Sequence, residues 1–505
     1  MVEAKDGMVI ETNNARVQEA RKTMYELLLS NHDKKCLTCA RNQDCEFQAL
    51  GRELGVEDSP YEGERDLKPI DVSESITRDP NKCILCRRCV SVCKNIQTTS
   101  ILTAENRGFQ TVITPAFGLP MGNTACTFCG QCVIVCPVGA LRETTHKDRV
   151  IQAINDPDKH VVVQPAPAVR VGIGECFGLP AGTCETGKLA AALHRMGFDD
   201  VFDTNWGADL TIMEEGTEFL ERFRAVISGG VATLPMITSC SPGWARYLEQ
   251  HAPDIIRNIS SCKSPMEMFA AVLRDKYREK DAADGRRTYH VAIMPCTAKK
   301  MEAARPEFTQ EGRPDVDLVI TTRELVDMIR EAGIQLTELE PEAPDLPFGL
   351  GSGAAVIYGV TGGVAEAVVR YCLPDKSNNA LQAIRVTDLR GDGAIREVNL
   401  TVEGQELHLA IVNGLSHAKE LIADVEAGKR FYHLVEVMTC QGGCVGGAGQ
   451  PYGLTAAKKR RGAGLYEADS SAMFKRAEKN PIVTRLLEDY GPDRCHELLH
   501  VHYGE

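Results

Sequence analysis

The sequence has few aromatic residues, no excess of positive charge and no long apolar run. Phe, Trp and Tyr make up 6% of the 505 residues, and only two residues are Trp. The formal net charge of −13 argues against a nucleic-acid-binding protein, because such proteins contact phosphates through basic side chains. No apolar run approaches the roughly 18 residues that a membrane span needs, and the first residues lack the basic flank and apolar core of a signal peptide. We therefore expect a cytoplasmic protein without a membrane span.

Cysteine, by contrast, is abundant, with 20 in the chain. Most of these cysteines lie in tight groups, whereas a disulfide framework would spread them along the sequence. In a reducing compartment, grouped cysteines indicate metal sites. A chain of 505 residues is also long enough for several domains and at least one large core.

The first group combines one histidine with three cysteines. It consists of His32, Cys36, Cys39 and Cys45, in a polar loop after a segment with helical apolar spacing that ends at Asn31. Zinc accepts three cysteines and one histidine, and so does an iron–sulfur cluster with one imidazole ligand. A solvated histidine beside three structural thiols is the competing interpretation.

Two copies of the pattern Cys-x₂-Cys-x₂-Cys-x₃-Cys form the most specific motif of the chain. In two-cluster ferredoxins, the fourth cysteine of each copy ligates the cluster that the other copy holds. The first copy lacks the usual following proline, because Lys94 stands there. The motif predicts two [4Fe–4S] clusters, one held by Cys83, Cys86, Cys89 and Cys136 and the other by Cys93, Cys126, Cys129 and Cys132.

From about Asp156 onward, the pattern changes to alternating strands and helices. An alanine-rich helix is expected at Gly187–Met196. Such alternation predicts an α/β fold with largely parallel sheets covered by helices, and ligand loops in such folds lie at the carboxyl ends of strands. The strand candidates are His160–Gln164, Ala232–Ile237, Tyr289–Met294 and Val316–Ile320.

Three loops after this point carry further cysteines. Cys240 and Ser241 lie in Thr-Ser-Cys-Ser-Pro-Gly-Trp, and Cys296 lies in Met-Pro-Cys-Thr-Ala-Lys-Lys-Met-Glu, each directly after a strand candidate. Cys440 and Cys444 lie in a glycine-rich segment, where a helical turn would place both sulfurs on one side. Four thiols from three loops suit a cubane [4Fe–4S] cluster.

Together these motifs resemble those of the [FeFe]-hydrogenases over essentially the whole chain, from His32 to the closing segment at Tyr503. The resemblance implies an H-cluster, in which a [4Fe–4S] cubane is bridged through one cysteine to a two-iron site with CO, cyanide and azadithiolate. By this resemblance Cys444 is the bridging thiolate, and Cys296 and Cys440 are further cubane ligands. The residues that it places at the cofactor are Ala166, Pro167, Ser241, Pro295, Lys299 and Met438, of which Lys299 and Met438 are also counted as catalytic.

The first loop departs from the family pattern, which has two adjacent cysteines. Ser241 stands in the second place, which ligates the cubane in the family, and Cys240 stands in the first place, which relays protons. Either Cys240 becomes the ligand and Ser241 or water relays protons, or Ser241 ligates iron through oxygen. Thiolate is the softer and commoner iron–sulfur ligand, so we expect Cys240 to be the ligand, although the register favours Ser241. Met266 and Ala448 also replace a common glutamine and a glycine.

The resemblance also implies a proton path between the cofactor and solvent. Its members here are Cys240, Glu215, Ser260, Glu218 and Arg222. If their segment is helical, Glu215, Glu218 and Arg222 share one helical face. Spacing alone would favour an exposed acidic face of a helix, and only the resemblance favours the proton path.

The implied activity is the reversible oxidation of H₂ to protons and electrons. Three accessory [4Fe–4S] clusters would pass electrons to ferredoxin or to a flavin- and NAD(P)-binding partner subunit, and maturation proteins would supply the two-iron site. We expect three regions: an N-terminal His-Cys₃ cluster domain at residues 1–70, a small α+β two-cluster ferredoxin-like domain at 71–150, and a catalytic domain at 151–505 with the cofactor between two lobes.

Two alternatives belong to other classes of protein. One is a non-catalytic iron–sulfur sensor or assembly protein that keeps the cubane but lacks the two-iron site. The other is a zinc protease, because residues 496–500 read His-Glu-x-x-His. The hydrogenase family has a similar ending, which argues against the second alternative. Whether a [2Fe–2S] domain, found in larger relatives, precedes this chain is left open by the sequence.

Overall fold

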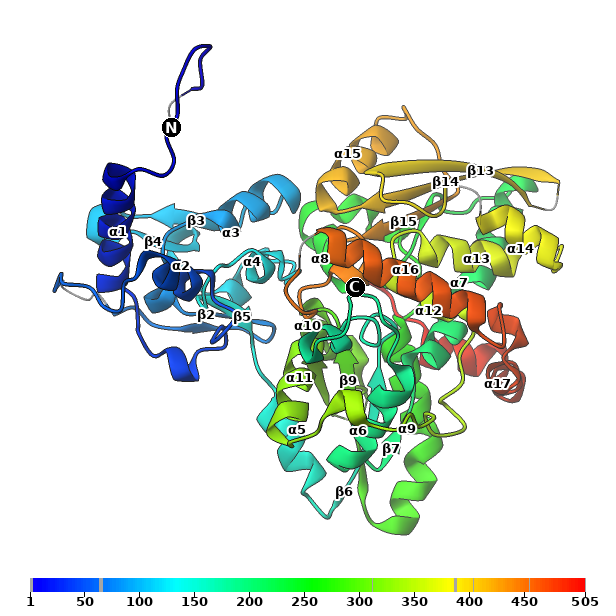
Figure 1. Ribbon diagram of the computed structural model, residues 1–505. Coiled ribbons are helices and arrows are strands. Elements are labelled where there is room, and N and C mark those ends of the chain that lie inside the picture. The colour runs from blue at the N-terminus through cyan, green and yellow to red at the C-terminus, as the bar shows by residue number, and fades with distance from the viewer. Residues whose placement is uncertain are drawn as a thin grey trace.

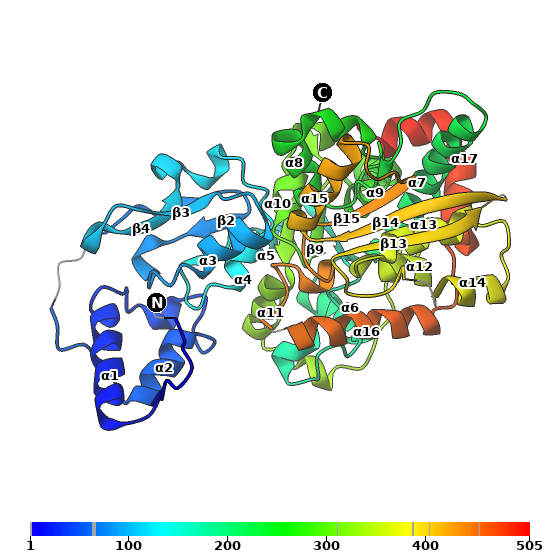
Figure 2. The same cartoon turned by 90° about the horizontal axis from the view of Figure 1, so that it is seen from above.

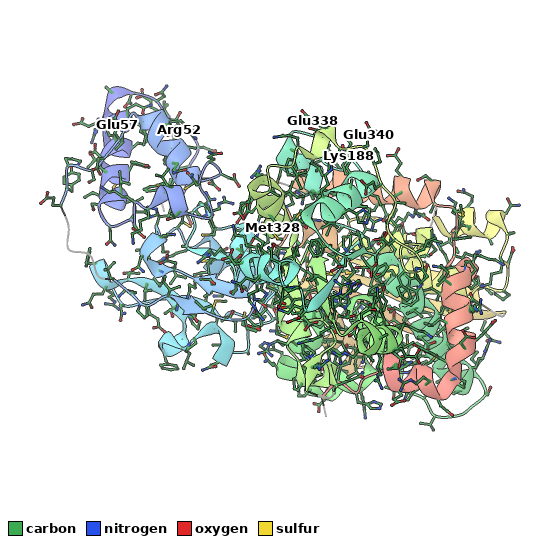
Figure 3. All side chains as sticks on the ribbon, turned by 90° about the horizontal axis from the view of Figure 1, so that it is seen from below. Arg52, Glu57, Lys188, Met328, Glu338 and Glu340 are labelled. Atoms are coloured by element: carbon green, nitrogen blue, oxygen red, sulfur yellow. The ribbon has the colours of Figure 1, made fainter. Side chains whose placement is uncertain are left out.

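The computed structural model describes residues 3–62, 67–310, 312–385, 388–402, 404–453 and 455–504. A small N-terminal part stands beside a larger part, as Figure 1 shows. The view from above also separates the two parts, which meet near α4 (Gln131–Ile134) and α10 (Ala298–Ala303) (Figure 2). The view from below agrees, with Arg52 and Glu57 in the small part and Lys188 in the larger one (Figure 3).

The N-terminal part begins with two helices, α1 (Ala15–Ser30) and α2 (Glu46–Leu54). The helix predicted before Asn31 is confirmed, but its apolar residues are only partly covered. Tyr25 is buried and its ring lies 4.4 Å from that of Phe47 on α2. The pattern residues that stay exposed are Met24, Leu27 and Leu28.

The two cysteine motifs form an internal repeat of backbone shape. In the first motif, Leu85 and Arg87 have φ of 55° and 60°, and in the second, Phe128 and Gly130 have φ of 53° and 66°. These left-handed residues turn the backbone sharply between the cysteines. Around the motifs lie the strands β1 (Asp71–Val72), β2 (Ile76–Arg78) and β5 (Leu141–Glu143) in one antiparallel sheet, and β3 (Leu102–Glu105) and β4 (Val112–Pro115) in another.

The first sheet of the larger part is entirely parallel, with the order β12-β9-β6-β7. Its strands are buried on both faces, since Val161 and Val163 of β6 join one apolar cluster and Val162 joins another. The predicted strands and the alanine-rich helix are confirmed here. The elements are β6 (Lys159–Pro165), β7 (Asp200–Val201), β9 (Arg287–Met294) and β12 (Leu318–Thr321), with α5 (Lys147–Ile154), α6 (Thr186–Met196) and α11 (Thr322–Glu331) on one face and α9 (Pro265–Asp284) and α7 (Thr204–Ile227) on the other.

The second sheet has the order β13-β14-β15-β8 and is mixed. The strand expected at Ala232–Ile237 is shorter, because β8 (Met236–Ile237) begins after Pro235, which cannot donate to a strand ladder. The sequence reading missed the long antiparallel pair at the sheet edge. The elements are β13 (Ile395–Val402), β14 (Gln405–Asn413) and β15 (Leu434–Met438), between α8 (Pro242–His251) and α15 (Leu415–Glu426) on one face and α7 and α13 (Gly363–Cys372) on the other.

The remaining elements cover the sheets and close the chain. No helix within the described ranges is both long and apolar enough to cross a membrane. The other helices are α3 (Arg88–Ser91), α12 (Gly353–Val356), α14 (Asn378–Arg385), α16 (Thr455–Ser471) and α17 (Pro481–Leu499), and a two-residue pair is formed by β10 (Thr309–Gln310) and β11 (Arg313–Pro314).

Candidate functional site

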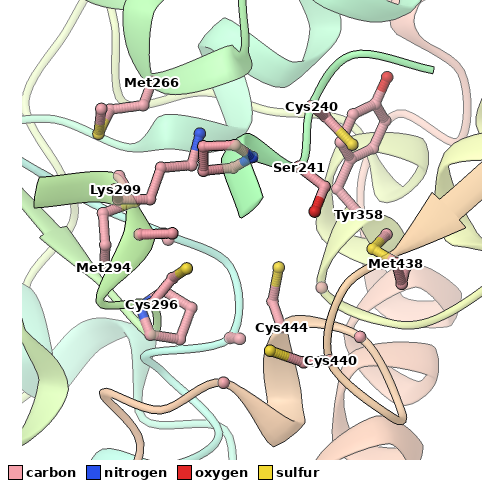
Figure 4. A pocket seen from close by; sticks show the side chains of 18 of the residues that line it. Cys240, Ser241, Met266, Met294, Cys296, Lys299, Tyr358, Met438, Cys440 and Cys444 are labelled. Atoms are coloured by element: carbon pink, nitrogen blue, oxygen red, sulfur yellow. The ribbon is translucent and has the colours of Figure 1, made fainter. Parts of the chain in front are cut away.

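The three cysteine loops meet in one cavity between the two sheets. Cys240 follows β8, Cys296 follows β9, and Cys440 and Cys444 follow β15, so each loop leaves the carboxyl end of a strand. Figure 4 shows these side chains around a common space of about 860 Å³. The position agrees with the general rule for ligand loops in α/β folds.

Glycines in the third loop allow it to pack directly against the second. A Cβ atom on Gly447 would lie 2.1 Å from the carbonyl oxygen of Pro295, and one on Gly443, where φ is +85°, would lie 2.7 Å from the Thr361 nitrogen. The expected helical turn through Cys440 and Cys444 is absent from this described segment, because only Cys444–Gly446 forms a short 3₁₀ turn. The glycines thus bring the two loops close enough to share one ligand.

Cys296, Cys440 and Cys444 provide three buried thiols. Burial raises the pKa of each, to about 12 for Cys444, and the charge of Cys296 raises the pKa of the other two further. Buried thiols with such raised pKa values stay protonated at neutral pH. An iron–sulfur cluster offsets the free-energy cost of deprotonating them, because its iron ions bind the thiolates. Three thiols around a cavity with mainly apolar walls fit a cubane cluster.

Cys240 and Ser241 point to different neighbours. The Ser241 hydroxyl lies 2.9 Å from that of Thr439, which directly precedes Cys440. Burial raises the pKa of Cys240 well above its ordinary value, and the charged neighbour with the next largest effect is Glu215. In Figure 4 the Cys240 sulfur lies beside Tyr358, apart from the other three sulfurs.

Lys299 reaches the cavity wall from the second loop. Its Nζ donates to the Ser264 hydroxyl at 2.8 Å and lies 2.6 Å from Oε2 of Glu302. Burial lowers the pKa of Lys299, but Glu302 and the nearby thiol of Cys296 outweigh that effect and hold it above its ordinary value. A charged ammonium therefore lies at the cavity wall, where it suits an anionic ligand.

The other cofactor residues predicted from the sequence also line this cavity. Ala166 and Pro167 come from the turn after β6, where Arg170 donates to the Pro167 carbonyl at 3.1 Å and pairs with Asp203 at 2.8 Å. This buried ion pair fixes the turn, and the sequence reading missed it. The lining residues named in advance are Ala166, Pro167, Cys240, Ser241, Met266, Pro295, Cys296, Lys299, Met438, Cys440 and Cys444.

The expected proton path forms a connected set on α7 and the segment after β8. Ser260 donates to Oε2 of Glu218 at 2.7 Å, and Glu218 also pairs with Arg222. Burial, and to a smaller extent the negative charge of Glu218, raises the pKa of Glu215 to about 8. Glu215 lies on the Cys240 side, whereas the Arg222 side chain is 19% exposed. The set therefore runs from the cavity to the protein surface.

The ferredoxin-like motifs bring their cysteines together in the predicted combination. Cys83, Cys86, Cys89 and Cys136 line one cavity of about 430 Å³. In the second set, burial is the largest cause that raises the pKa values of Cys126, Cys129 and Cys132. Cys93 is among the neighbouring thiols that raise these pKa values further. The members of this second set are Cys93, Cys126, Cys129 and Cys132.

His32 and its three cysteines surround a further cavity of about 1330 Å³. Burial lowers the pKa of His32, so its ring is neutral, and its Nδ1 atom has no hydrogen-bond partner among the described residues. A Cβ atom on Gly139 would lie 2.5 Å from the Cys39 sulfur. A neutral, unpartnered imidazole beside three thiols fits a metal cluster rather than a solvated histidine.

One contact between the small and large parts was missed by sequence reasoning. Gln131, inside the second ferredoxin motif, donates through Nε2 to the Cys440 sulfur at 3.1 Å and to the Gly446 carbonyl at 3.3 Å. Cys129 of the same motif lines the active-site cavity. Motif spacing contains no signal for a contact between residues so far apart in the chain.

Comparisons with known proteins agree with this geometry. Residues 159–448 match the iron only hydrogenase large subunit, C-terminal domain, and residues 455–505 match the iron hydrogenase small subunit. Residues 21–60 match the NADH-ubiquinone oxidoreductase-G iron-sulfur binding region, and residues 82–140 match the 4Fe-4S dicluster domain.

Individual relatives cover nearly the whole chain. The NADP-reducing hydrogenase subunit HndD of Solidesulfovibrio fructosivorans is 45% identical over 99% of this chain and 86% of its own length. Iron hydrogenase 1 of Clostridium pasteurianum is 38% identical over 99% of this chain and 88% of its own length. Among solved structures, a variant of apo [FeFe]-hydrogenase HydA1 from Chlamydomonas reinhardtii matches with a TM-score of 0.62 and 39% identity, over 71% of this chain and 99% of that one.

Proposed function

The chain belongs to the iron-only hydrogenase family, and from this membership we propose that it interconverts H₂ with protons and electrons at an H-cluster in the cavity between its two sheets. The observation that carries the proposal is the meeting of three buried thiols and the Lys299 ammonium in one cavity that a chain of acids connects to the surface. When bound, the two-iron part of the cofactor, with its CO, cyanide and azadithiolate groups, supplies the centre for H₂ cleavage and an internal amine base.

Cys296, Cys440 and Cys444 would hold the cubane, with Cys444 also bridging to the two-iron part. Lys299 would donate a charge-assisted hydrogen bond to an anionic ligand of that part. Met438, Pro295 and the Ala166-Pro167 turn line the same cavity and would exclude water from it.

For the fourth corner of the cubane, the geometry favours Ser241 over Cys240. Ser241 is hydrogen-bonded to Thr439, next to the ligand Cys440, whereas Cys240 faces Glu215. We therefore assign Cys240 to proton relay and Ser241 to iron through its oxygen. This assignment replaces the sequence-based expectation that Cys240 is the ligand. Thiolate is the softer iron ligand, but the Cys240 sulfur lies apart from the other three sulfurs (Figure 4).

Protons would pass between Cys240 and solvent through α7. Glu215, with a pKa of about 8, both accepts and releases a proton near neutral pH. The Ser260 hydroxyl donates to Glu218, and the ion pair with Arg222 keeps that carboxylate at the surface end of the path.

Electrons would pass through three accessory [4Fe–4S] clusters. The cluster of Cys126, Cys129, Cys132 and Cys93 lies next to the active site, because Cys129 lines that cavity. We keep the division into residues 1–70, 71–150 and 151–505 as a proposal, which the separate matches at 21–60, 82–140 and 159–448 support.

The electron partner would be a flavin- and NAD(P)-binding subunit, with ferredoxin as the choice if the chain works alone. The similarity to an NADP-reducing hydrogenase subunit and the match to an oxidoreductase iron–sulfur region support a multisubunit assembly in the cytoplasm. The exposed apolar face of α1 is suited to contact such a subunit. Its residues are Met24, Leu27 and Leu28.

A non-catalytic sensor or assembly protein would need the cubane but neither the proton path nor Lys299 at the cavity. Here Glu215 and Lys299 are both buried at the cavity side and held by specific partners. These features favour catalysis.

The test is infrared spectroscopy of the protein after maturation, together with H₂ evolution from a reduced dye. We expect CO and cyanide stretching bands and H₂ production, and both should disappear in Cys444→Ala, which lacks the bridging thiolate. Cys184→Ala, at an exposed cysteine, is the matched control. If the matured protein shows only iron–sulfur signals, the hydrogenase function is wrong.

A further inference from the structure

A second group of buried acids includes Glu302, the carboxylate partner of Lys299. Glu267 of α9 is fully buried, and within the described ranges neither of its carboxyl oxygens has a hydrogen-bond partner. The buried Tyr503 hydroxyl also lacks a hydrogen-bond partner there, whereas Oε2 of Glu302 and Oδ1 of Asp315 lie 2.6 and 3.0 Å from the cationic groups of Lys299 and Arg274. Buried polar atoms in native proteins are normally satisfied, so several unsatisfied atoms in one region indicate ordered water.

The charges of this group leave Glu267 without a cation of its own. Lys299 pairs with Glu302 at 2.6 Å, and Asp315 pairs with Lys263 at 3.4 Å and with Arg274 at 3.0 Å. Burial raises the pKa of Glu267 well above its ordinary value, and the charges of Glu302 and Asp315 outweigh those of Lys299 and Lys263. Burial and the neighbouring carboxylates therefore favour the protonated, neutral form of Glu267.

The group leads to a separate polar cavity. Asp315 lines this cavity of about 740 Å³ together with Arg274 and His290, and exposed arginines lie at its rim. On α9, Glu267, Ala270 and Arg274 stand at positions i, i+3 and i+7, so one helical face runs from the buried acid to the cavity. The Nδ1 atom of His290 has no partner among the described residues, which adds a site for water.

Resting on the proposed function, we propose that Glu267 holds the proton of a second proton route, which runs from Lys299 through Glu302 and Glu267 to Asp315 and the polar cavity. Toward the active site, Glu267 passes its proton to Glu302 and Asp315 replaces it from the cavity side, with one O–H bond breaking as another forms on the adjacent water or carboxylate. When the Lys299 ammonium gives up a proton on the active-site side, its N–H bond breaks, and a new N–H bond forms as the O–H bond of Glu302 breaks. Lys299 marks the active-site end, because its ammonium touches both Glu302 and the cavity wall. No electron moves in these steps.

The first test needs no two-iron cofactor, so it does not depend on hydrogenase activity. Infrared spectra of the unmatured protein at neutral pH should show the C=O band of a protonated carboxyl group that is lost in Glu267→Gln and kept in Glu279→Gln, an exposed acid on the same helix. In D₂O the band should shift promptly, and Asp315→Asn should slow that shift at least about tenfold. A spectrum unchanged by Glu267→Gln, or a band that does not exchange, would overturn the proposal.

The second test uses the matured enzyme and a double-mutant cycle with the path through Glu218. If two routes work in parallel, Glu267→Gln should lower the H₂-evolution rate at least about tenfold more in the Glu218→Gln background than in the wild-type background. Equal fold losses in both backgrounds would mean a purely structural role for Glu267. Glu267→Leu, which also fills the space without a titratable group, serves if the glutamine variant does not fold.

Failure of the two proposals can be told apart. If the carboxyl band is lost in Glu267→Gln but the wild-type protein evolves no H₂, the hydrogenase function is contradicted, whereas the protonated state of Glu267 is supported. H₂ evolution without that band would contradict the second route alone.

Discussion

In the proposed assignment, Ser241 places an oxygen where a sulfur would complete a ring of four thiols. Its hydroxyl is hydrogen-bonded to Thr439, and the neighbouring Cys240 faces Glu215 instead. An oxygen ligand binds iron less softly than a thiolate, so the cubane of this chain should be held more weakly at that corner. With Ser241 as the ligand, the thiol of Cys240 stays free to relay protons. The loop then both ligates the cubane and relays protons.

Ser241→Cys should therefore strengthen the cubane. We expect slower loss of its iron to a chelator, by about tenfold or more, because a softer ligand replaces the oxygen. Ser241→Ala should have the opposite effect, and Ser228→Ala, at an exposed serine, is the control. Electron paramagnetic resonance of the reduced cubane reports its integrity. If Cys240→Ser loses the cubane while Ser241→Ala keeps it, Cys240 is the ligand.

Glu215→Gln should change how stability depends on pH. The pKa of Glu215 is raised by burial and by Glu218 from 4.5 to about 8 in the folded protein. Between these values the folded state holds a proton that the unfolded state has lost, so the free energy of unfolding falls as pH rises. That contribution, up to roughly 1.4 kcal/mol per pH unit, disappears in the variant.

Chemical denaturation across this pH range measures the effect. The variant should match the wild type near the unfolded pKa and gain relative stability up to the folded pKa. Glu221→Gln, at an exposed acid of the same helix, should show a flat difference. A flat difference for Glu215→Gln as well would show that its carboxyl group is ionised in the folded protein.

Among the structural elements, the loop after β15 depends most on backbone contact. Gly447 lies against the Pro295 carbonyl, and Gly449 lies against Met294 and Pro295 as well. The loop thus sits directly on the end of β9, with no side chain between them. This contact sets the distance between thiols that come from different sheets.

Gly447→Ala should separate the two loops. Its Cβ atom would lie 2.1 Å from a backbone oxygen, which cannot rotate away. We expect loss of the cubane, so that iron analysis falls by about four atoms per chain, while the ferredoxin-like clusters keep their signals. Gly122→Ala, where nothing lies within 4 Å, should leave the iron content unchanged. Full iron content in Gly447→Ala would mean that the loop adjusts without losing its ligands.

In the molecule as a whole, the small N-terminal part contacts the larger part at a glycine. Gly130 has a φ of +66°, and a Cβ atom there would lie 2.3 Å from the Thr297 hydroxyl and 2.4 Å from the Ala448 side chain. Its neighbour Gln131 donates to the cubane ligand Cys440. The replacement of a family glycine by Ala448 therefore coincides with a tight contact between the parts.

Gly130→Ala should weaken electron transfer without damaging the active site. We expect H₂ to reduce the N-terminal clusters at least about tenfold more slowly, because a shift on the order of 1 Å disturbs a matched contact. Exchange of hydrogen isotopes between H₂ and water, which needs only the active site, should stay within about twofold of the wild type. Equal losses in both assays would place the effect in the catalytic part, and Gly122→Ala is again the control.

The sequence was sufficient for features that depend on local pattern. Strand runs such as His160–Gln164 and the spacing of the cysteine motifs predicted where the cysteines would lie. It was insufficient for contacts between distant segments, such as Gln131 with Cys440 or Arg170 with Asp203, because the local sequence pattern contains no signal for them. The β13–β14 hairpin was not predicted because the sequence pattern favours alternating strands and helices. The exposed face of α1 was not predicted because periodicity does not reveal whether a face is covered.

The cavity joins a cysteine of one sheet, Cys296, to two cysteines of the other, Cys440 and Cys444. A cubane held by all three is a covalent cross-link between lobes that are otherwise in non-covalent contact. Iron supply would then govern mechanical rigidity as well as chemistry, since metal-binding free energy adds to the free energy of unfolding. The iron-free protein should be the pliable form, in which the lobes can separate.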